Sequence, residues 1–171
     1  IFTNNDEWAA LLRSYAVHGK GSMKYDNVRI GMNSRLDTVQ AAILQVKFSA
    51  FAEHELVDVN ERAGWYDELL ADSALKLPVV PDGFESSWAQ YTVICPEKIG
   101  RDDLQAKLKG QGIPTMVYYP KPMHEQLAFA DRSLALPCPV TEHLCTNVLS
   151  LPMGPYLTRE NCVTAAEHLI N

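Results

Sequence analysis

The sequence lacks the features that define several classes of protein. No apolar run in the 171 residues approaches the roughly 18 that a membrane-spanning helix needs. No Lys/Arg cluster offsets the formal net charge of −6, so nothing in the composition predicts a nucleic-acid partner. We therefore expect neither a membrane nor a nucleic acid among its partners.

Metal-binding and hydrolase motifs are missing as well. The five histidines contain no H-x-x-x-H pair and the four cysteines have no C-x-x-C spacing, so no zinc site is predicted. There is also no G-x-S-x-G nucleophile elbow. Because no secretory signal is visible, we expect a cytoplasmic protein with unpaired thiols.

What is present is an ordinary globular composition, 47% hydrophobic and 21% charged. The length allows one domain, or one small domain with pieces of another. The chain opens on an apolar triplet, Ile1–Thr3, without an initiator methionine and resembling the tail of a strand. We therefore expect it to be a fragment.

The most informative stretch is Gly31–Leu44, which reads GMNSRLDTVQAAIL. Ser34 and Asp37 have the spacing of a capping box, which predicts a helix that begins near Arg35. Apolar side chains then recur at helical spacing, at Leu36, Val39, Ile43 and Val46. Unpaired amides and the dipole at such a helix start favour an anion nearby, although an ordinary capped helix has the same pattern.

The helical pattern continues to about Leu70, which predicts a helix on the order of 50 Å long unless it breaks near residues 58–60. A helix of this length suggests a spine between two domains. Its acidic residues are expected on the solvated face: Glu53, Glu55, Asp58, Glu61, Asp67 and Glu68.

The rest of the chain alternates between helical and strand patterns. A first helix is predicted at Asp6–Val17, with an inward apolar face of Trp8, Leu11, Leu12 and Tyr15. Strands are expected at residues 88–95, 115–119 and 147–151. Helices are expected at residues 102–111, at 124–130, and from Thr158 or Asn161 to Leu169. From Trp88 onward, this alternation of strands and helices predicts a small α/β unit.

The run Tyr118–His124 is the second unusual feature. Two tyrosines end a predicted strand, and two prolines hold the following chain extended. Hydroxyl, ammonium and imidazole groups thus gather at the carboxyl end of a strand, where α/β folds commonly bind ligands. A proline-stiffened loop with one buried tyrosine is the alternative.

The run Gly31–Leu44 resembles the G-x-N-x-R-L-D-x-x-Q-A-A-I-L signature of the DegT/DnrJ/EryC1/StrS aminotransferases, PLP-dependent enzymes that aminate keto groups on nucleotide-linked sugars. Further resemblances follow in the family's order, at His18-Gly19, Gln90-Tyr91-Thr92, Gly112–Thr115, Tyr119–His124 and Leu149–Met153. The segment Val28–Asp37 is most similar to aminotransferases that act on UDP-linked 3-keto-N-acetylhexosaminuronic acids.

The resemblance implies an α/β fold, the C-terminal part of a fold-type I PLP-dependent transferase. Residues 1–35 would end the PLP-binding large domain, 36–77 would form a long connecting helix, and 78–171 would form a small α/β domain.

The resemblance also implies roles for individual residues. Asn33 would donate to the PLP phosphate of the partner subunit, and Arg35 would approach the sugar. A neutral amide suits a phosphate oxygen, and a guanidinium suits a sugar acid. Tyr118, Tyr119 and His124 would bind the nucleotide sugar. Tyr118 stands where many relatives have histidine, and relatives differ at the position of His124.

The lysine that forms the Schiff base with PLP would lie upstream, so no catalytic residue is assigned and this chain alone should not transaminate. The expected function is amino transfer, with glutamate as donor, to a nucleotide-linked keto sugar for surface polysaccharide or antibiotic pathways, in a homodimer with shared active sites. Two alternatives stay open: a sugar dehydratase of the same family, and a non-catalytic binding or sensor module on the same scaffold.

Overall fold

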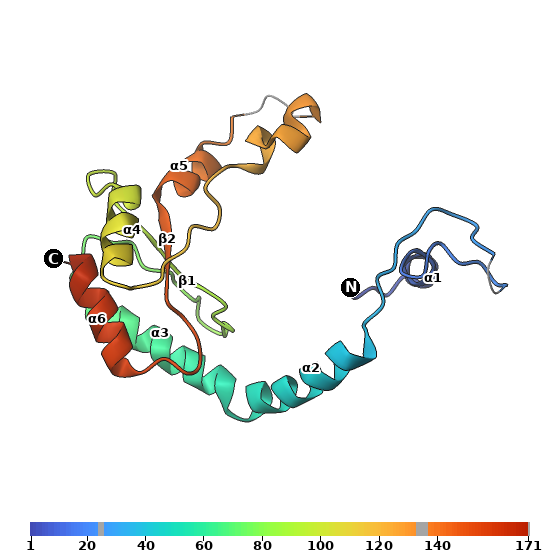
Figure 1. Cartoon of the computed structure of the whole chain (residues 1–171), viewed down its shortest axis with the longest axis horizontal. Coiled ribbons are helices and arrows are strands. Elements are labelled where there is room, and N and C mark those ends of the chain that lie inside the picture. Colours follow the sequence, from blue (N-terminus) through green and yellow to red (C-terminus); the bar gives the residue numbers. More distant parts are fainter. Residues whose placement is uncertain (24–25, 133–136, 171) are drawn as a thin grey trace. The chain divides into compact units, whose positions relative to one another are not determined.

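A computed structural model describes residues 1–23, 26–132 and 137–170 (Figure 1). The chain divides into two units, residues 1–50 and residues 51–171, each with its own internal contacts. The boundary lies inside the stretch for which the sequence predicts one long helix. The three-part division into residues 1–35, 36–77 and 78–171 stays a prediction.

Unit 1 (residues 1–50) contains two helices, α1 (Asp6–Tyr15) and α2 (Thr38–Ala50), joined by an irregular segment. Asn5 caps α1, since its side-chain oxygen accepts a hydrogen bond from the Trp8 amide at 3.0 Å. The helix ends two residues before the predicted Val17, because the backbone turns into the left-handed region at His18, with φ of 58°.

The start of α2 differs from the prediction. We expected Ser34 to cap a helix beginning near Arg35, but the helix begins at Thr38. The side chain of Asp37 accepts a hydrogen bond from the Val39 amide at 2.8 Å, so Asp37 caps the helix alone. The negative charge of this carboxylate also stands at the helix start, where we had expected a free anion to be favoured.

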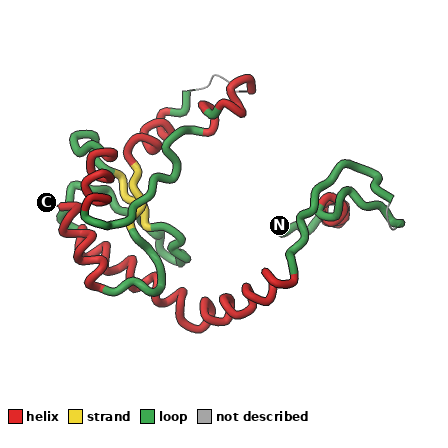
Figure 2. Tube along the Cα trace, viewed as in Figure 1, coloured by secondary structure: helices red, strands yellow, loops and turns green. Residues whose placement is uncertain are grey.

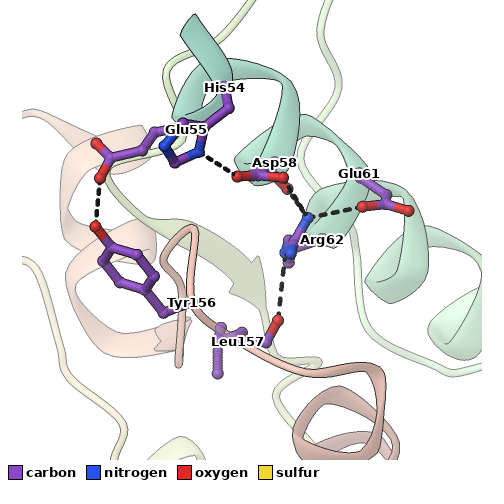
Figure 3. A network of polar contacts seen from close by, with 7 residues as sticks. All are labelled: His54, Glu55, Asp58, Glu61, Arg62, Tyr156 and Leu157. Carbon is purple, nitrogen blue, oxygen red and sulfur yellow. Dashed lines mark hydrogen bonds and ion pairs between the residues drawn. The ribbon is translucent and has the colours of Figure 1, made fainter. Parts of the chain in front are cut away.

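The predicted continuous helix is interrupted. A π-helical turn, η1 (Phe51–Glu55), follows α2 in the chain, and α3 (Leu56–Leu70) follows η1. The interruption thus precedes residues 58–60, where we expected any break. Glu55 is also wrongly predicted as solvated: it is 5% exposed, and its carboxylate accepts a hydrogen bond from the Tyr156 hydroxyl at 2.5 Å (Figure 3). A π-turn shifts the helix register, which places Glu55 on the buried side.

Unit 1 buries little of its apolar surface. The predicted core face of α1 is largely exposed, with Trp8 at 63% and Tyr15 at 43%. No residue of α2 is buried. The prediction of a buried face was wrong for this unit. Two short helices and an irregular segment are too small to cover the apolar side chains of both α1 and α2.

Unit 2 (residues 51–171) is built on a two-stranded sheet, with its strands in the middle of the unit (Figure 2). Strand β1 (Tyr91–Ile94) pairs antiparallel with β2 (Val148–Leu151). Both strands are shorter than the runs from which they were predicted. Trp88 in particular has a φ of 44°, which removes it from the extended conformation and delays the start of β1.

The third predicted strand is reduced to a single bridge. Met116 pairs with Ser150 through two backbone hydrogen bonds of 3.1 and 2.8 Å. Pro114 and Pro120 flank this segment, and because proline has no backbone N–H, they prevent the pairing from extending. The bridge nevertheless places Thr115 to Tyr118 beside β2.

Helices cover the sheet. Two of them, α4 (Arg101–Gly110) and α6 (Arg159–Ile170), lie close to their predicted positions. The helix predicted at residues 124–130 is instead two 3₁₀ turns, η2 (Met123–Glu125) and η3 (Leu127–Arg132). Helix α5 (Pro139–Asn147) was not predicted. Its first residue, Pro139, looks like a helix breaker, but a proline in the first turn removes only an amide that would be unpaired anyway.

The core of unit 2 joins α3, α4, α6 and the sheet. Tyr66 of α3 packs on Tyr91 of β1 with ring centroids 5.0 Å apart. The Tyr66 hydroxyl donates to the Pro152 carbonyl, and the Tyr91 hydroxyl donates to the Asp67 carboxylate. Most of the remaining core side chains are aliphatic: Leu70, Val93, Leu104, Leu108, Leu149, Leu151 and Leu169. In the part of the chain that the structure describes, no helix is long and apolar enough to cross a bilayer.

Candidate functional site

Asn33 is positioned by a backbone ladder within unit 1. The segment 28–34 runs beside residues 15–20, and Asn33 forms an antiparallel bridge with Val17. The ladder bonds are His18 N to Met32 O at 3.0 Å, Met32 N to Tyr15 O at 2.9 Å, and Ser34 N to Ala16 O at 2.9 Å. The backbone of Asn33 is therefore fixed, although its side chain is exposed.

Two glycines make this ladder possible. A Cβ atom added to Gly31 would lie 2.2 Å from the Gly19 nitrogen, and one added to Gly19 would lie 1.8 Å from the Arg29 carbonyl oxygen. Gly19 also has a φ of 75°, in the region that favours glycine. The glycine of the G-x-N motif is thus required because two backbones touch, two residues before Asn33.

A buried hydroxyl braces the same ladder from the side. Ser14 is 9% exposed, and its hydroxyl donates to the Lys20 carbonyl at 2.6 Å. The Arg29 guanidinium donates to the Ser14 hydroxyl and lies 5.8 Å from the centre of the Tyr15 ring. Arg29 therefore serves the local structure, and sequence reasoning gave it no role.

Asn33 and Arg35 are brought together. The Arg35 Nε donates to the Asn33 side-chain oxygen at 3.1 Å. A guanidinium can only donate, so the amide oxygen must face it, and the amide nitrogen of Asn33 is the atom left to donate to a ligand. The pair thus presents N–H donors from both side chains at an exposed position, which suits an oxyanion.

Tyr118 and Tyr119 form a second pair, in unit 2. Their ring centroids are 5.9 Å apart in an edge-to-face arrangement, and their exposed fractions are 41% and 72%. Both line a cavity of about 400 Å³, which we call the tyrosine cavity. Its other lining residues are mostly apolar: Lys121, Pro122, Met123, Gln126, Thr141, Leu144, Cys145 and Val148. A cavity of this size and character can hold a small organic ligand.

His124 lies on η2, beside α5. Its Nε2 is 3.6 Å from a Glu142 carboxylate oxygen and 4.0 Å from one of Glu125. It is not among the described residues that line the tyrosine cavity. The predicted contact between His124 and a substrate stays a prediction. The structure joins Asn33 with Arg35 in one unit and Tyr118 with Tyr119 in the other.

A further polar network lies in unit 2 and was not predicted. His54 and Arg62 both contact the Asp58 carboxylate, at 2.9 and 3.1 Å (Figure 3). The hydrogen bond from His54 lowers the pKa of Asp58. Arg62 also donates to the Leu157 carbonyl at 3.3 Å, which ties α3 to the loop before α6. These contacts join α3 to η1 and to the loop before α6.

Two of the cysteine thiols have shifted pKa values. Cys95 and Cys162 are buried and form no disulfide with another described residue. Burial raises the pKa values of both thiols, which keeps them protonated. Within residues 1–23, 26–132 and 137–170, no group of three His, Cys, Asp or Glu side chains is arranged to hold a metal ion.

Comparison with known proteins identifies close relatives. A model of the DegT/DnrJ/EryC1/StrS aminotransferase family matches residues 1–169. The UDP-2-acetamido-2-deoxy-3-oxo-D-glucuronate aminotransferase of Pseudomonas aeruginosa is 43% identical over 157 residues, which are 92% of this chain and 42% of that protein. The UDP-N-acetyl-3-dehydro-alpha-D-glucosamine 3-aminotransferase of Acidithiobacillus ferrooxidans is 38% identical, over 97% of this chain and 43% of that protein.

Solved structures show the same relationship. A DegT DnrJ EryC1 StrS aminotransferase from Brucella abortus superimposes with a TM-score of 0.85 at 44% identity, over 98% of this chain and 44% of that one. The chain thus spans less than half the length of the curated relatives it matches.

Proposed function

The chain belongs to the DegT/DnrJ/EryC1/StrS aminotransferase family, and from that premise we propose that it completes the active site of a PLP-dependent nucleotide-sugar aminotransferase. The observation that carries the proposal is the pairing of the exposed Asn33 side chain with Arg35. The amide oxygen of Asn33 accepts a hydrogen bond from Arg35. The amide nitrogen of Asn33 can only donate, and a phosphate oxygen requires such a donor. The donor set of this site therefore fits PLP through its phosphate.

Bound PLP supplies the electron sink that amino transfer from glutamate requires. The residues of this chain hold and orient the reactants. Asn33 donates one hydrogen bond to the phosphate without adding a charge. The remaining guanidinium donors of Arg35 face a carboxylate or hydroxyl of the sugar, which a planar fork can bind in two places. Tyr118 and Tyr119 provide an aromatic wall against which the nucleotide sugar packs.

A homodimer belongs to the same proposal, with Asn33 reaching the cofactor of the partner subunit. The exposed apolar side chains of α2 support it, because apolar surface that is left exposed favours association. These side chains are between 52% and 72% exposed: Val39, Ile43, Leu44, Val46 and Phe48. The cytoplasmic location predicted from the sequence is also part of the proposal.

The relatives suggest a substrate class. Both curated relatives named above act on UDP sugars that carry an N-acetyl group and a 3-keto group, according to their names. We propose such a sugar as the amino acceptor of this protein.

The test is made on the full-length protein. We expect an absorbance band of bound PLP, and conversion of a UDP-linked 2-acetamido-3-keto sugar to its amine with glutamate as donor. PLP binding with loss of water from the sugar in place of amination would select the dehydratase alternative. Absence of the PLP band would overturn the proposal and favour the non-catalytic module.

A further inference from the structure

Three of the sequence motifs converge on one small cavity in unit 2 that the proposed function does not use. The cavity has a volume of about 220 Å³. It is lined by Gln90, Thr115 and Ser150, one residue from each of the Gln90-Tyr91-Thr92, Gly112–Thr115 and Leu149–Met153 motifs. The other lining residues are Ala89, Pro114, Met116, Tyr118, Leu151 and Met153. We call it the threonine cavity.

The side chain of Thr115 is exceptional among the residues of this cavity. Its hydroxyl oxygen is buried, and among the described residues it has no hydrogen-bond partner. The Ser150 hydroxyl, by contrast, is bonded to the Thr92 hydroxyl at 2.8 Å. A buried hydroxyl without a partner destabilises a folded protein, so such a group in a native structure calls for an explanation. Thr115 lines the cavity, and its side chain can rotate about the Cα–Cβ bond between staggered positions, which moves the hydroxyl to a different side of the residue.

None of the described residues that line the threonine cavity carries a charge, so a charged group would lose its hydration without gaining a partner among them. Its polar groups are the Gln90 amide and the hydroxyls. Its apolar groups include the side chains of Met116, Leu151 and Met153. A ligand group that fits is small and neutral, with a hydrogen-bond acceptor, a donor and a methyl. An acetamido group has all three.

The threonine cavity adjoins the proposed sugar site. Tyr118 lines both this cavity and the tyrosine cavity. A sugar that packs against the tyrosine pair can therefore extend a substituent toward Thr115. The cavity volume leaves room for an acetamido group together with ordered water.

We propose that the threonine cavity binds the acetamido group of the nucleotide-sugar substrate, and that Thr115 selects for this group. The Thr115 hydroxyl donates to the acetamido carbonyl, and the methyl lies against Met116, Leu151 and Met153. The inference rests on the proposed function and deepens it, because it names the residue that distinguishes 2-acetamido sugars from 2-hydroxy sugars.

The test compares two unreactive probes, UDP-N-acetylglucosamine and UDP-glucose, by titration calorimetry on the full-length protein. We expect the wild-type protein to prefer the acetamido sugar. Thr115→Val should weaken binding of UDP-N-acetylglucosamine about tenfold and leave UDP-glucose binding unchanged. Thr115→Ser, which keeps the hydroxyl, should retain the preference.

Thermal unfolding provides an independent readout. Because the hydroxyl is unpartnered in the free protein, Thr115→Val should leave the Tm unchanged or raise it. A lower Tm would show that the hydroxyl is already satisfied and would overturn the proposal.

Equal weakening of both probes by Thr115→Val would also overturn the proposal. So would no weakening of either, because Thr115 would then not contribute to binding of the acetamido group. A wild-type protein that binds PLP and both sugars without preferring the acetamido group contradicts this inference alone. One that binds neither sugar contradicts the proposed function as well.

Discussion

The two units of the chain hold their shape in different ways. In unit 2, side chains such as Tyr66, Leu108 and Leu149 are fully buried between helices and sheet. In unit 1, Ser14 is the only buried side chain of α1 and no residue of α2 is buried. What positions Asn33 is a set of backbone hydrogen bonds and two glycine contacts.

Because of this difference, we expect the stability of the fold to depend mainly on unit 2, and the positioning of Asn33 and Arg35 to depend on unit 1. A buried core makes unit 2 a self-supporting scaffold for Tyr118 and Tyr119. In unit 1, backbone hydrogen bonds position the exposed donors of Asn33 and Arg35, while the apolar faces of α1 and α2 stay uncovered. Uncovered apolar faces are expected of a segment that forms part of an interface, as the proposed homodimer requires. Mutations in the two units should therefore have different signatures.

The largest effect is expected from a core truncation in unit 2. Leu108→Ala removes a fully buried side chain and should lower the free energy of unfolding of that unit by about 2–5 kcal/mol. Hydrogen exchange of the β1 and β2 amides in the full-length protein measures it. The matched change in unit 1 is Ile43→Ala, at a side chain that is 54% exposed, and it should leave the protection of β1 and β2 unchanged. Equal effects of both variants would contradict the comparison.

Gly31→Ala should act on unit 1 alone. The added Cβ would lie 2.2 Å from the Gly19 nitrogen, so the ladder must move apart, at a cost of about 1–3 kcal/mol. We expect faster exchange of the amides of His18, Met32 and Ser34 and weaker PLP binding, with β1 unaffected.

The control is Gly64→Ala on α3, where nothing lies within 4 Å of the added atom. Alanine is the better helix former, so this variant should stabilise unit 2 by about 0.5–1 kcal/mol. If Gly31→Ala were as harmless, the glycine contact would not be what positions Asn33.

Alkaline pH should weaken unit 2 through its buried tyrosines. Burial raises the pKa values of Tyr66 and Tyr91 above the ordinary 10.0, so both phenols stay neutral when folded. The contribution is fully present below pH 10 and is lost as the pH rises, because the unfolded chain then ionises first. The loss is at most about 1.4 kcal/mol per pH unit for each tyrosine. Urea unfolding between pH 9 and 11 measures it, and Tyr66→Phe should show a shallower pH dependence.

Most helices could be predicted from the sequence because their apolar residues recur at helical spacing, as in α3 and α6. The prediction failed where the same residues were compatible with two local structures. Ser34 and Asp37 can each cap a helix, and only the ladder that holds Ser34 decides for Asp37. Pro139, the first residue of α5, fits a loop and a first helical turn equally well.

The site was predicted less completely than the fold. The motif located Asn33 and Arg35, but their mutual hydrogen bond depends on side-chain geometry that spacing does not specify. The brace between Ser14 and Arg29 joins residues fifteen positions apart and left no sequence pattern. The threonine cavity could not be predicted from the sequence, because its three motifs are distant in the chain and only the folded structure brings them together. The one signal in the sequence was that these motifs had no assigned role.

The most direct test of how unit 1 works is the dissociation constant of PLP for the full-length protein, in a double-mutant cycle of Asn33→Ala and Arg35→Ala. Each single variant should weaken PLP binding, Asn33→Ala by about tenfold or more, because it removes the proposed donor to the phosphate. Arg35→Ala should have no further effect once Asn33 is gone, since it acts on the phosphate by orienting that amide. Asn27→Ala, at another exposed asparagine of unit 1, is the matched control and should bind PLP normally. Unchanged PLP affinity in Asn33→Ala would contradict the assigned role.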